Sequence, residues 1–461
     1  MWLSPSVFSP TTSFSFKMPA IATLPQPTAP LQVWNSLVKK CIPQEENKDI
    51  KFWWNLTGYH LGVMIDAAGY SLEKQYEVLL FHSHWIVPRL GPAPKPDGTP
   101  MFKSLVAYDG SPFEYSWKWN ISTGEPDIRY SWEAVGKNSG TPSDPLNHDP
   151  SLDYMNKVTQ VLPKTDYTWF RHFLAEIYNP DRGCYAKELE AGEPPATTLM
   201  HAVEYNKKAD FGLKSYFLAR KLFQGGDPAT LQEWDNAIVK LSPGEAHPGR
   251  DALMHFLATS PEGKLMKPNV MGMDNVDSSK SRLKMYFTSA NTSFQSVREI
   301  MTMGGICDVS EESLQDLRSM ILAVLGLPSD FPEEENISVE ATTGGNSWKD
   351  FEALCEGFIY FFDIAPANGK PEVKFYLTTR KYGADDLTIA RNLVGWMHAH
   401  GRGAYCDAYM GMLEKIAEHR GLENGKGMHA YISYQCSQKG EPDVKSYISP
   451  ELYHKARYPG I

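Results

Sequence analysis

Hydrophobic and polar residues alternate along five pairs of short segments, and a short polar connection joins the two members of each pair. Alternation at every second position predicts β-strands, and a short polar connection predicts that the two strands form an antiparallel hairpin. The predicted strand pairs are 112–119 with 128–134, 198–205 with 211–218, 270–276 with 281–288, 357–363 with 373–379, and 428–435 with 443–448.

Segments with helical periodicity separate the hairpins. Apolar residues in these segments recur every three or four positions, which is the spacing of one face of an α-helix. The predicted helices cover 167–178, 231–241, 293–303, 312–325, 386–398 and 404–418. Residues 31–91 are also predicted to be helical, with the last helix of that region over 72–87, and a Pro/Gly-rich linker follows at 92–100. From the first hairpin onward the chain repeats a ββαα order.

The predicted fold class is α+β, with a ten-stranded antiparallel β-barrel surrounded by helices and built from five ββαα units. Helices outside the barrel must pack on apolar strand residues such as Leu283 and Met285, so the opposite strand faces line the lumen. The alternative is an open α+β sandwich. That arrangement would leave long strand edges without hydrogen-bonding partners.

Basic residues and tyrosines occupy alternate positions in four of the strand segments. These are Lys214-Ser215-Tyr216, Arg282-Leu283-Lys284-Met285-Tyr286, Lys374-Phe375-Tyr376 and, with hydroxyl groups in place of the cation, Tyr431-Ile432-Ser433. A solvated strand face accounts for most single segments of this kind. Repetition favours a lumen that binds an anion. Ammonium and guanidinium groups beside aromatic faces suit the ionisation of a prenyl diphosphate to a carbocation.

Charge and cysteine usage exclude several functional classes. The 461-residue chain has a formal net charge of −10, which argues against a nucleic-acid-binding surface and makes the basic strand residues a local feature. The cysteines show no CxxC pair and no clustered spacing, so neither a zinc site nor a disulfide framework is indicated, and a cytoplasmic location fits. They are Cys41, Cys184, Cys307, Cys355, Cys406 and Cys436.

Residues 1–30 are rich in Ser, Thr and Pro and are predicted to be a disordered leader, followed by a single domain over 31–461. No segment offers the about 18 consecutive apolar residues that a membrane span needs. The oligomeric state stays open, with a homodimer as one option.

The order and spacing of six segments resemble the fungal aromatic prenyltransferases of the dimethylallyltryptophan synthase type. The segments are Phe52-Trp53-Trp54, Asp109-Gly110-Ser111-Pro112-Phe113-Glu114, Ile128-Arg129-Tyr130, Leu213-Lys214-Ser215-Tyr216, Ser281-Arg282-Leu283-Lys284-Met285-Tyr286 and His429-Ala430-Tyr431-Ile432-Ser433. Each is a weak signal alone, and the match covers nearly the whole chain after Leu31. The resemblance implies the ten-stranded ABBA barrel and transfer of a dimethylallyl group from dimethylallyl diphosphate to an aromatic carbon in secondary metabolism.

The resemblance also implies site residues, most of which the strand pattern already indicated. The diphosphate-binding set is Arg129, Lys214, Arg282, Lys284 and Lys374, and the tyrosines that shield the cation are Tyr216, Tyr286, Tyr376 and Tyr431. Leu105 and Val106 correspond to residues that contact the aromatic acceptor. The sequence departs from relatives in two places: Tyr434-Gln435-Cys436 lacks a further tyrosine, and Lys374 replaces a glutamine of some members.

Glu114 and His201 are the predicted catalytic residues. In the family the glutamate accepts a hydrogen bond from an indole N–H or a phenolic O–H; the alternative is a rim carboxylate paired with Lys118. His201 shares a strand face with Val203 and Tyr205 and matches a position where some relatives carry the lysine that collects the proton lost on rearomatisation. A histidine with a pKa of about 6.5 could accept that proton, and a structural histidine is the alternative.

Acidic metal-binding motifs are incomplete. Asp385-Asp386 begins like the aspartate-rich motif of chain-elongating prenyltransferases but lacks the last acid, and Glu333-Glu334-Glu335 looks like a solvated loop. We therefore expect no metal and no cofactor beyond dimethylallyl diphosphate. A metal-dependent terpene cyclase is accordingly disfavoured.

The predicted partner is an aromatic small molecule, either an indole diterpene or a phenolic polyketide. The alternatives are a tryptophan or cyclic dipeptide prenyltransferase of the same family, or a barrel that only binds a small molecule.

Overall fold

The computed structural model describes residues 29–40, 47–120, 125–193, 195, 197–220, 230–242, 244–338, 357–364, 369–436 and 442–458. The predictions for residues 1–28 of the leader and for Cys41 and Cys355 concern residues outside these ranges.

The strands form one closed antiparallel barrel, in which β1 pairs with β2 on one side and with β10 on the other. The strands are β1 (Phe113–Trp119), β2 (Pro126–Trp132), β3 (Leu199–Tyr205), β4 (Gly212–Leu218), β5 (Lys267–Asp274), β6 (Leu283–Ser289), β7 (Phe358–Asp363), β8 (Glu372–Leu377), β9 (His429–Cys436) and β10 (Pro442–Ile448). Consecutive strands pair all the way round, so closure removes every exposed edge. The predicted barrel is confirmed, and each strand begins and ends within about three residues of its predicted bounds.

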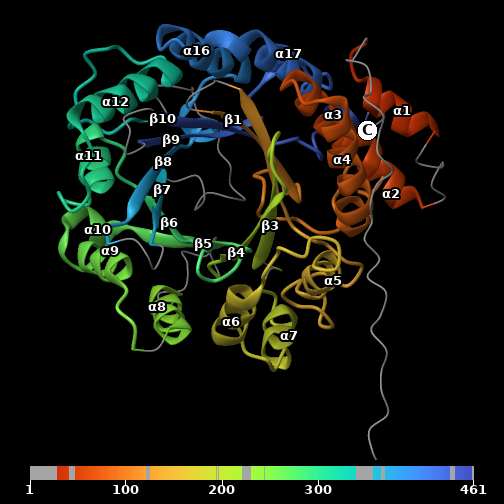
Figure 1. The fold of residues 1–461 in the computed structure, drawn as a ribbon, viewed down its shortest axis with the longest axis horizontal. Coiled ribbons are helices and arrows are strands. Elements are labelled where there is room, and N and C mark those ends of the chain that lie inside the picture. The colour runs from red at the N-terminus through yellow and green to blue at the C-terminus, as the bar shows by residue number, and fades with distance from the viewer. Residues whose placement is uncertain are drawn as a thin grey trace, which may run out of the picture.

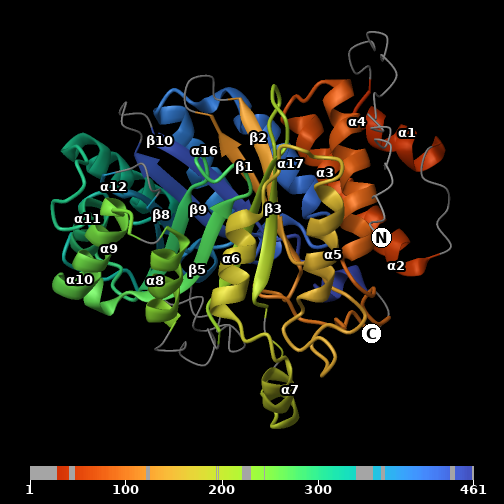
Figure 2. The same cartoon turned by 60° about the horizontal axis from the view of Figure 1, so that its bottom comes forward.

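Helices surround the barrel as a ring, as Figure 1 shows from one end of the lumen. They are α1 (Gln32–Lys40), α2 (Lys48–Trp53), α3 (Tyr59–Ala67), α4 (Leu72–Phe81), α5 (Asp149–Val158), α6 (Thr168–Ile177), α7 (Gly183–Glu190), α8 (Thr230–Leu241), α9 (Pro248–Thr259), α10 (Pro261–Leu265), α11 (Phe294–Thr302), α12 (Glu311–Leu325), α15 (Thr379–Tyr382), α16 (Asp386–Ala399) and α17 (Cys406–Ile416). Helices α1 to α4 pack together beside β1 and β2, and α11 and α12 cover the opposite side (Figures 1 and 2). None of the described helices is long and apolar enough to cross a membrane.

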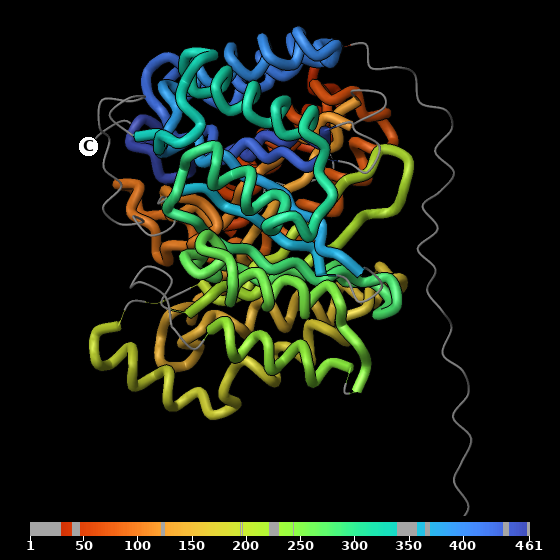
Figure 3. The backbone as a smooth tube through the Cα atoms, turned by 90° about the vertical axis from the view of Figure 1, so that its left-hand side faces the viewer, coloured from red at the N-terminus to blue at the C-terminus, as the bar shows by residue number. Residues whose placement is uncertain are grey.

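The sequence pattern did not predict α5, α7, α9, α10 or α15. Helix α15 has four residues, and the other four helices begin at or beside Gly or Pro. The predicted helix over 72–87 is α4 followed by a π turn (His82–Ile86) and a 3-10 turn (Val87–Arg89). Figure 3 shows the molecule from the side that carries α11 and α12.

The main hydrophobic core lies between the barrel and the helices. Leu283, Met285 and Phe375 point outward from their strands and are fully buried in that core. Because side chains alternate along a strand, Lys284, Tyr286 and their equivalents point into the lumen. The predicted orientation of the two strand faces is therefore correct.

Candidate active site

Five cation–hydroxyl pairs define the lumen. The even-numbered strands run in the same direction, since every neighbouring pair is antiparallel. Each places a cation two residues before a hydroxyl-bearing residue: Arg129 and Ser131 on β2, Lys214 and Tyr216 on β4, Lys284 and Tyr286 on β6, Lys374 and Tyr376 on β8, and Lys445 and Tyr447 on β10. The cations consequently form one layer of the lumen, and the hydroxyl groups form the next.

Asp274, at the end of β5, holds three of the basic groups together. Its carboxylate lies 2.5 Å from Lys214 Nζ, 3.3 Å from Lys284 Nζ and 2.8 Å from Arg282 Nε. Burial alone would raise the pKa of Asp274, but these three cations outweigh it and hold that pKa far below its usual range. Arg282 lies at the rim, where 47% of its side chain is exposed and it also approaches Asp363 at 3.5 Å.

A second cluster of cations gathers around Asp443 on β10. Its carboxylate lies 3.8 Å from Lys374 Nζ, 3.8 Å from Lys445 Nζ and 3.7 Å from Lys118 Nζ. Lys118 thus pairs with Asp443, and this geometry does not support the alternative in which it pairs with Glu114. Lys374 is only 1% exposed, and burial lowers its pKa well below the usual value even with Asp443 nearby.

Each cluster contains a buried lysine whose pKa is lowered despite the neighbouring carboxylate. Burial, together with the neighbouring Lys214, lowers the pKa of Lys284 to about 7. A multiply charged anion entering this layer would restore the charged form of such a lysine and would receive charge-assisted hydrogen bonds in a region of low dielectric constant.

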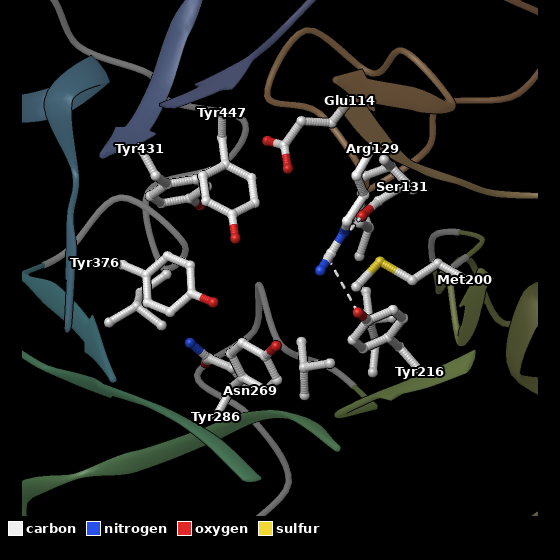
Figure 4. A pocket seen from close by; sticks show the side chains of 15 residues that line it. Glu114, Arg129, Ser131, Met200, Tyr216, Asn269, Tyr286, Tyr376, Tyr431 and Tyr447 are labelled. Carbon is white, nitrogen blue, oxygen red and sulfur yellow. Dashed lines mark hydrogen bonds between the residues drawn. The ribbon is translucent and has the colours of Figure 1, made fainter. Parts of the chain in front are cut away.

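Tyr216, Tyr286, Tyr376 and Tyr447 form the tyrosine layer, which is next to the cation layer along the lumen. This layer lines a pocket with about 760 Å³ of empty volume. The ring centroids of Tyr286 and Tyr376 are 6.0 Å apart, and those of Tyr376 and Tyr447 are 5.6 Å apart. Arg129 links the layers, because its Nη2 donates a hydrogen bond of 3.0 Å to the hydroxyl of Tyr216 (Figure 4).

Tyr447, which was not among the predicted site residues, also points its ring into this pocket (Figure 4). The signal was present: Lys445-Ser446-Tyr447 has the spacing of Lys214-Ser215-Tyr216 and lies in a predicted strand. The pocket therefore has a fifth tyrosine besides Tyr216, Tyr286, Tyr376 and Tyr431.

The remaining wall of the pocket is mostly apolar and carries one carboxylate. Glu114 is the second residue of β1 and is 8% exposed; burial raises its pKa to about 8, and Arg129 opposes that shift only in part. The side chains around it on this wall are Leu105, Val106, Ser131, Met200, Leu218, Asn269, Val270 and Ile359. An aromatic molecule bound here would place a polar substituent against Glu114.

His201 does not line this pocket. Its ring lies on the outer side of β3, buried among Trp132, Tyr154 and Phe170, and its Nδ1 is 3.1 Å from Ser215 Oγ. Burial lowers the pKa of His201 to about 3, which disfavours the imidazolium form. The predicted role as proton acceptor is therefore not supported, and the structural alternative fits this environment.

Met200 takes the place in the wall that His201 was predicted to hold. Of the other predicted site residues, eight line one pocket: Leu105, Val106, Glu114, Arg129, Tyr216, Tyr286, Tyr376 and Tyr431. Lys214, Lys284 and Lys374 lie buried in the cation layer, with Arg282 at its rim.

Comparison with known proteins identifies the family. A family model described as tryptophan dimethylallyltransferase matches residues 49–412. Prenyltransferase anuH of Penicillium roqueforti (strain FM164) is 45% identical over 432 residues, which are 93% of this chain and 94% of that protein. Xanthone prenyltransferase B of Emericella nidulans is 39% identical over 434 residues, 92% of each chain. The chain belongs to the tryptophan dimethylallyltransferase family.

Solved structures agree on the fold. The crystal structure of AnaPT from Neosartorya fischeri superposes with a TM-score of 0.75 at 18% identity, covering 91% of this chain and 97% of AnaPT. NotF in complex with brevianamide F and DMSPP gives a TM-score of 0.72 at 19% identity, covering 91% and 99% of the two chains. The predicted ABBA barrel and the prediction of an aromatic prenyltransferase are both confirmed.

Proposed function

We propose that this protein transfers a dimethylallyl group from dimethylallyl diphosphate to a ring carbon of a hydroxylated, fused-ring aromatic compound, without a metal ion. The observation that carries the proposal is the stacking of three environments in one lumen: a cation layer, a tyrosine layer, and an apolar wall with the single carboxylate of Glu114. Each environment matches one part of the reaction.

The cation layer would hold the diphosphate. Lys214, Lys284 and Arg129 would stabilise the leaving group more strongly as the C–O bond breaks and the electron pair moves to oxygen, which lowers the barrier to ionisation. In the free lumen the lysines are held by Asp274 and Glu204, with Lys214 Nζ 3.3 Å from the latter. A bound diphosphate would compete with these carboxylates for the same groups.

The tyrosine layer would enclose the dimethylallyl cation. Faces of Tyr216, Tyr286 and Tyr376 around the reaction space contribute on the order of 0.5–2 kcal/mol each as cation–π partners. The same rings exclude water, which would otherwise capture the cation as an alcohol.

Glu114 would activate the acceptor. A phenolic O–H that donates to this carboxylate gains electron density in its ring, and a ring carbon then attacks the allylic cation to form the new C–C bond. The substituted carbon afterwards loses its proton, and the ring becomes aromatic again. With His201 outside the lumen, Glu114 and the released diphosphate are the bases that the proposed reaction supplies.

The phenolic acceptor is favoured by the relatives named xanthone prenyltransferase A and B, both 39% identical to this chain. The indole diterpene that the sequence also suggested has no such support from these relatives. The apolar wall formed by residues such as Val270 and Ile359 suits a flat fused-ring compound.

The test is turnover of dimethylallyl diphosphate with a hydroxyxanthone, an indole diterpene and tryptophan in the presence of excess EDTA, with products identified by mass spectrometry. We expect prenylated hydroxyxanthone at an unchanged rate in EDTA. Turnover that requires added magnesium would overturn charge neutralisation by the protein, and efficient turnover of tryptophan alone would overturn the proposed acceptor.

A further inference from the structure

A buried carboxylate outside the pocket wall organises the acceptor end of the lumen. Glu133 follows β2 directly and is 1% exposed. Its Oε2 accepts hydrogen bonds from Ser104 Oγ at 2.5 Å and Thr197 Oγ1 at 2.6 Å, and its Oε1 accepts one from Asn147 Nδ2 at 2.8 Å. These partners come from three segments that are far apart in the sequence.

Both hydroxyl groups also bond to the loop that lines the pocket. Ser104 Oγ accepts a hydrogen bond of 3.1 Å from the backbone N–H of Val106, and Thr197 Oγ1 accepts one of 2.8 Å from the backbone N–H of Leu105. Leu105 and Val106 are the two residues of this loop that line the pocket. Each backbone N–H is therefore one hydroxyl group away from the same carboxylate oxygen.

Other residues of the acceptor wall lie close in the sequence to Glu133 or to its hydrogen-bond partners. Thr197 lies three residues before Met200, and Glu133 lies two residues after Ser131; both Met200 and Ser131 line the pocket. The backbone N–H of Glu133 donates to the carbonyl of Pro112 at 3.0 Å, two residues before Glu114.

We propose that Glu133, acting through the hydroxyl groups of Ser104 and Thr197, is a positioning residue that fixes the acceptor wall and thereby sets which ring carbon is prenylated. The proposal rests on the proposed function, since it assigns the wall at Leu105 and Val106 to the aromatic acceptor. A carboxylate suits this task because it accepts from several donors at once, and its two hydroxyl partners can each also accept a backbone N–H. Burial raises the pKa of Glu133 to about 7 while the three hydrogen bonds oppose that shift.

The hydrogen bonds from Glu133 through Ser104 and Thr197 to the N–H groups of Val106 and Leu105 are called the relay below. Its loss can be distinguished from a general loss of folding. The cation layer that would bind the donor is built on Asp274 and Asp443, whereas the side-chain hydrogen-bond partners of Glu133 are Ser104, Thr197 and Asn147. Loss of the relay should move the acceptor wall and leave the donor site unchanged. A general loss of folding would instead weaken both.

The experiment uses Thr197→Val, which keeps the side-chain shape and removes the acceptor of the Leu105 N–H, together with Ser104→Ala and Glu133→Gln. Leaving a buried donor without its partner costs enough free energy to weaken binding at the affected site by about 5- to 100-fold. We expect the KM for a hydroxyxanthone to rise by about 5-fold or more and the ratio of prenylated isomers to change. The KM for dimethylallyl diphosphate should stay within about twofold of the wild-type value, because the variants leave its contacts in place.

Glu262→Gln is the matched control. Its carboxylate accepts hydrogen bonds from Ser296 Oγ at 2.6 Å and Asn291 Nδ2 at 3.1 Å, away from the pocket lining. This variant should leave both KM values and the isomer ratio unchanged. Equal changes in the two KM values of Glu133→Gln, or no change in the isomer ratio, would overturn the positioning role.

Hydrogen exchange tests the relay without turnover. In wild-type protein the N–H groups of Leu105 and Val106 should be protected. In Thr197→Val the Leu105 N–H should exchange at least about tenfold faster, because it loses its acceptor. Unchanged exchange would disprove the relay even if the enzyme prenylates a hydroxyxanthone. Faster exchange in a protein that prenylates no phenolic ring would leave the relay standing and refute the proposed acceptor instead.

Discussion

The ring of Tyr216 lies so close to the backbone of Gly272 that a Cβ atom at Gly272 would stand 2.6 Å from Cδ1 of that ring. The two residues are directly paired between β4 and β5. The missing side chain at Gly272 gives the tyrosine room to lie over the strand, where its hydroxyl accepts the hydrogen bond from Arg129. The spacing of the tyrosine layer thus depends on one glycine.

Gly272→Ala should displace the Tyr216 ring, break its hydrogen bond with Arg129 and let water reach the cation. We expect about 2- to 30-fold slower prenylation, corresponding to one cation–π contact, and a larger share of dimethylallyl alcohol among the products. Chromatography of both products from one reaction measures this share. Gly395→Ala is the control, since a Cβ at Gly395 meets nothing within 4 Å; a Gly272→Ala enzyme with the same product share as that control would refute the role of the close approach.

Glu114 should make acceptor turnover depend on pH. Its pKa is raised to about 8, so the ionised form that accepts the phenolic hydrogen bond becomes more populated as the pH rises toward that value. We expect kcat/KM for a hydroxyxanthone to rise up to about tenfold per pH unit below 8, and Glu114→Gln to lower it by about 10²-fold, the lower end for general-base assistance.

Rates measured from pH 6 to 9 for wild type and Glu114→Gln separate the carboxylate from ionisation of the phenol. Any dependence that comes from the phenol persists in the variant. Identical pH profiles for the two enzymes would exclude Glu114 as the titrating group.

Donor binding should show the opposite pH dependence. Burial lowers the pKa of Lys284 to about 7 in the free protein, so the ammonium form that binds an anion is lost as the pH rises through 7. The affinity for dimethylallyl thiolodiphosphate should therefore fall by up to about tenfold per pH unit above 7. Isothermal titration between pH 6 and 9 measures it.

Lys284→Met should weaken this binding and flatten the pH dependence. Lys370→Met is the control, because Lys370 is exposed and pairs with Asp308. A Lys284→Met protein that keeps the steep dependence would assign it to another group.

His201→Ala should affect folding rather than chemistry. The substitution leaves a cavity among Trp132, Tyr154 and Phe170 and should lower the free energy of unfolding by about 2–4 kcal/mol, as large-to-small core changes do. The ratio of diphosphate released to prenylated product, measured below the melting temperature, should equal that of wild type. An altered ratio would restore the role in proton removal that the sequence suggested.

Lys214 lies in the lumen, as the alternation predicted, and His201 lies outside it; one physical cause explains both placements. Side chains alternate along a strand, so a shift of one residue exchanges the two faces. At Lys214 the residue types decide the face, because Lys and Tyr alternate with Leu213, Ser215 and Phe217. On β3 they do not: His201 follows Met200, and either could face the lumen until pairing of Met200 with Tyr216 fixes the register.

Asp274 and Asp443 show a second limit on what can be predicted from the sequence. Asp274 and Asp443 are far apart in the sequence, and each completes a cluster that includes cations from other strands. Nothing local to either aspartate distinguishes it from an acidic residue on a solvated strand face. Only the barrel brings it against the lysines.

The sequence by itself determined the strands, most of the longer helices around them and the chemistry of the inward faces, because hydrophobic periodicity and alternation are properties of neighbouring residues. Tertiary structure decided the rest. Closure of the barrel set which strands are neighbours, and so brought Glu133 to Ser104, Asn147 and Thr197 and placed Tyr447 beside Tyr376. Such contacts join segments that share no local pattern, and their geometry follows from strand register and packing.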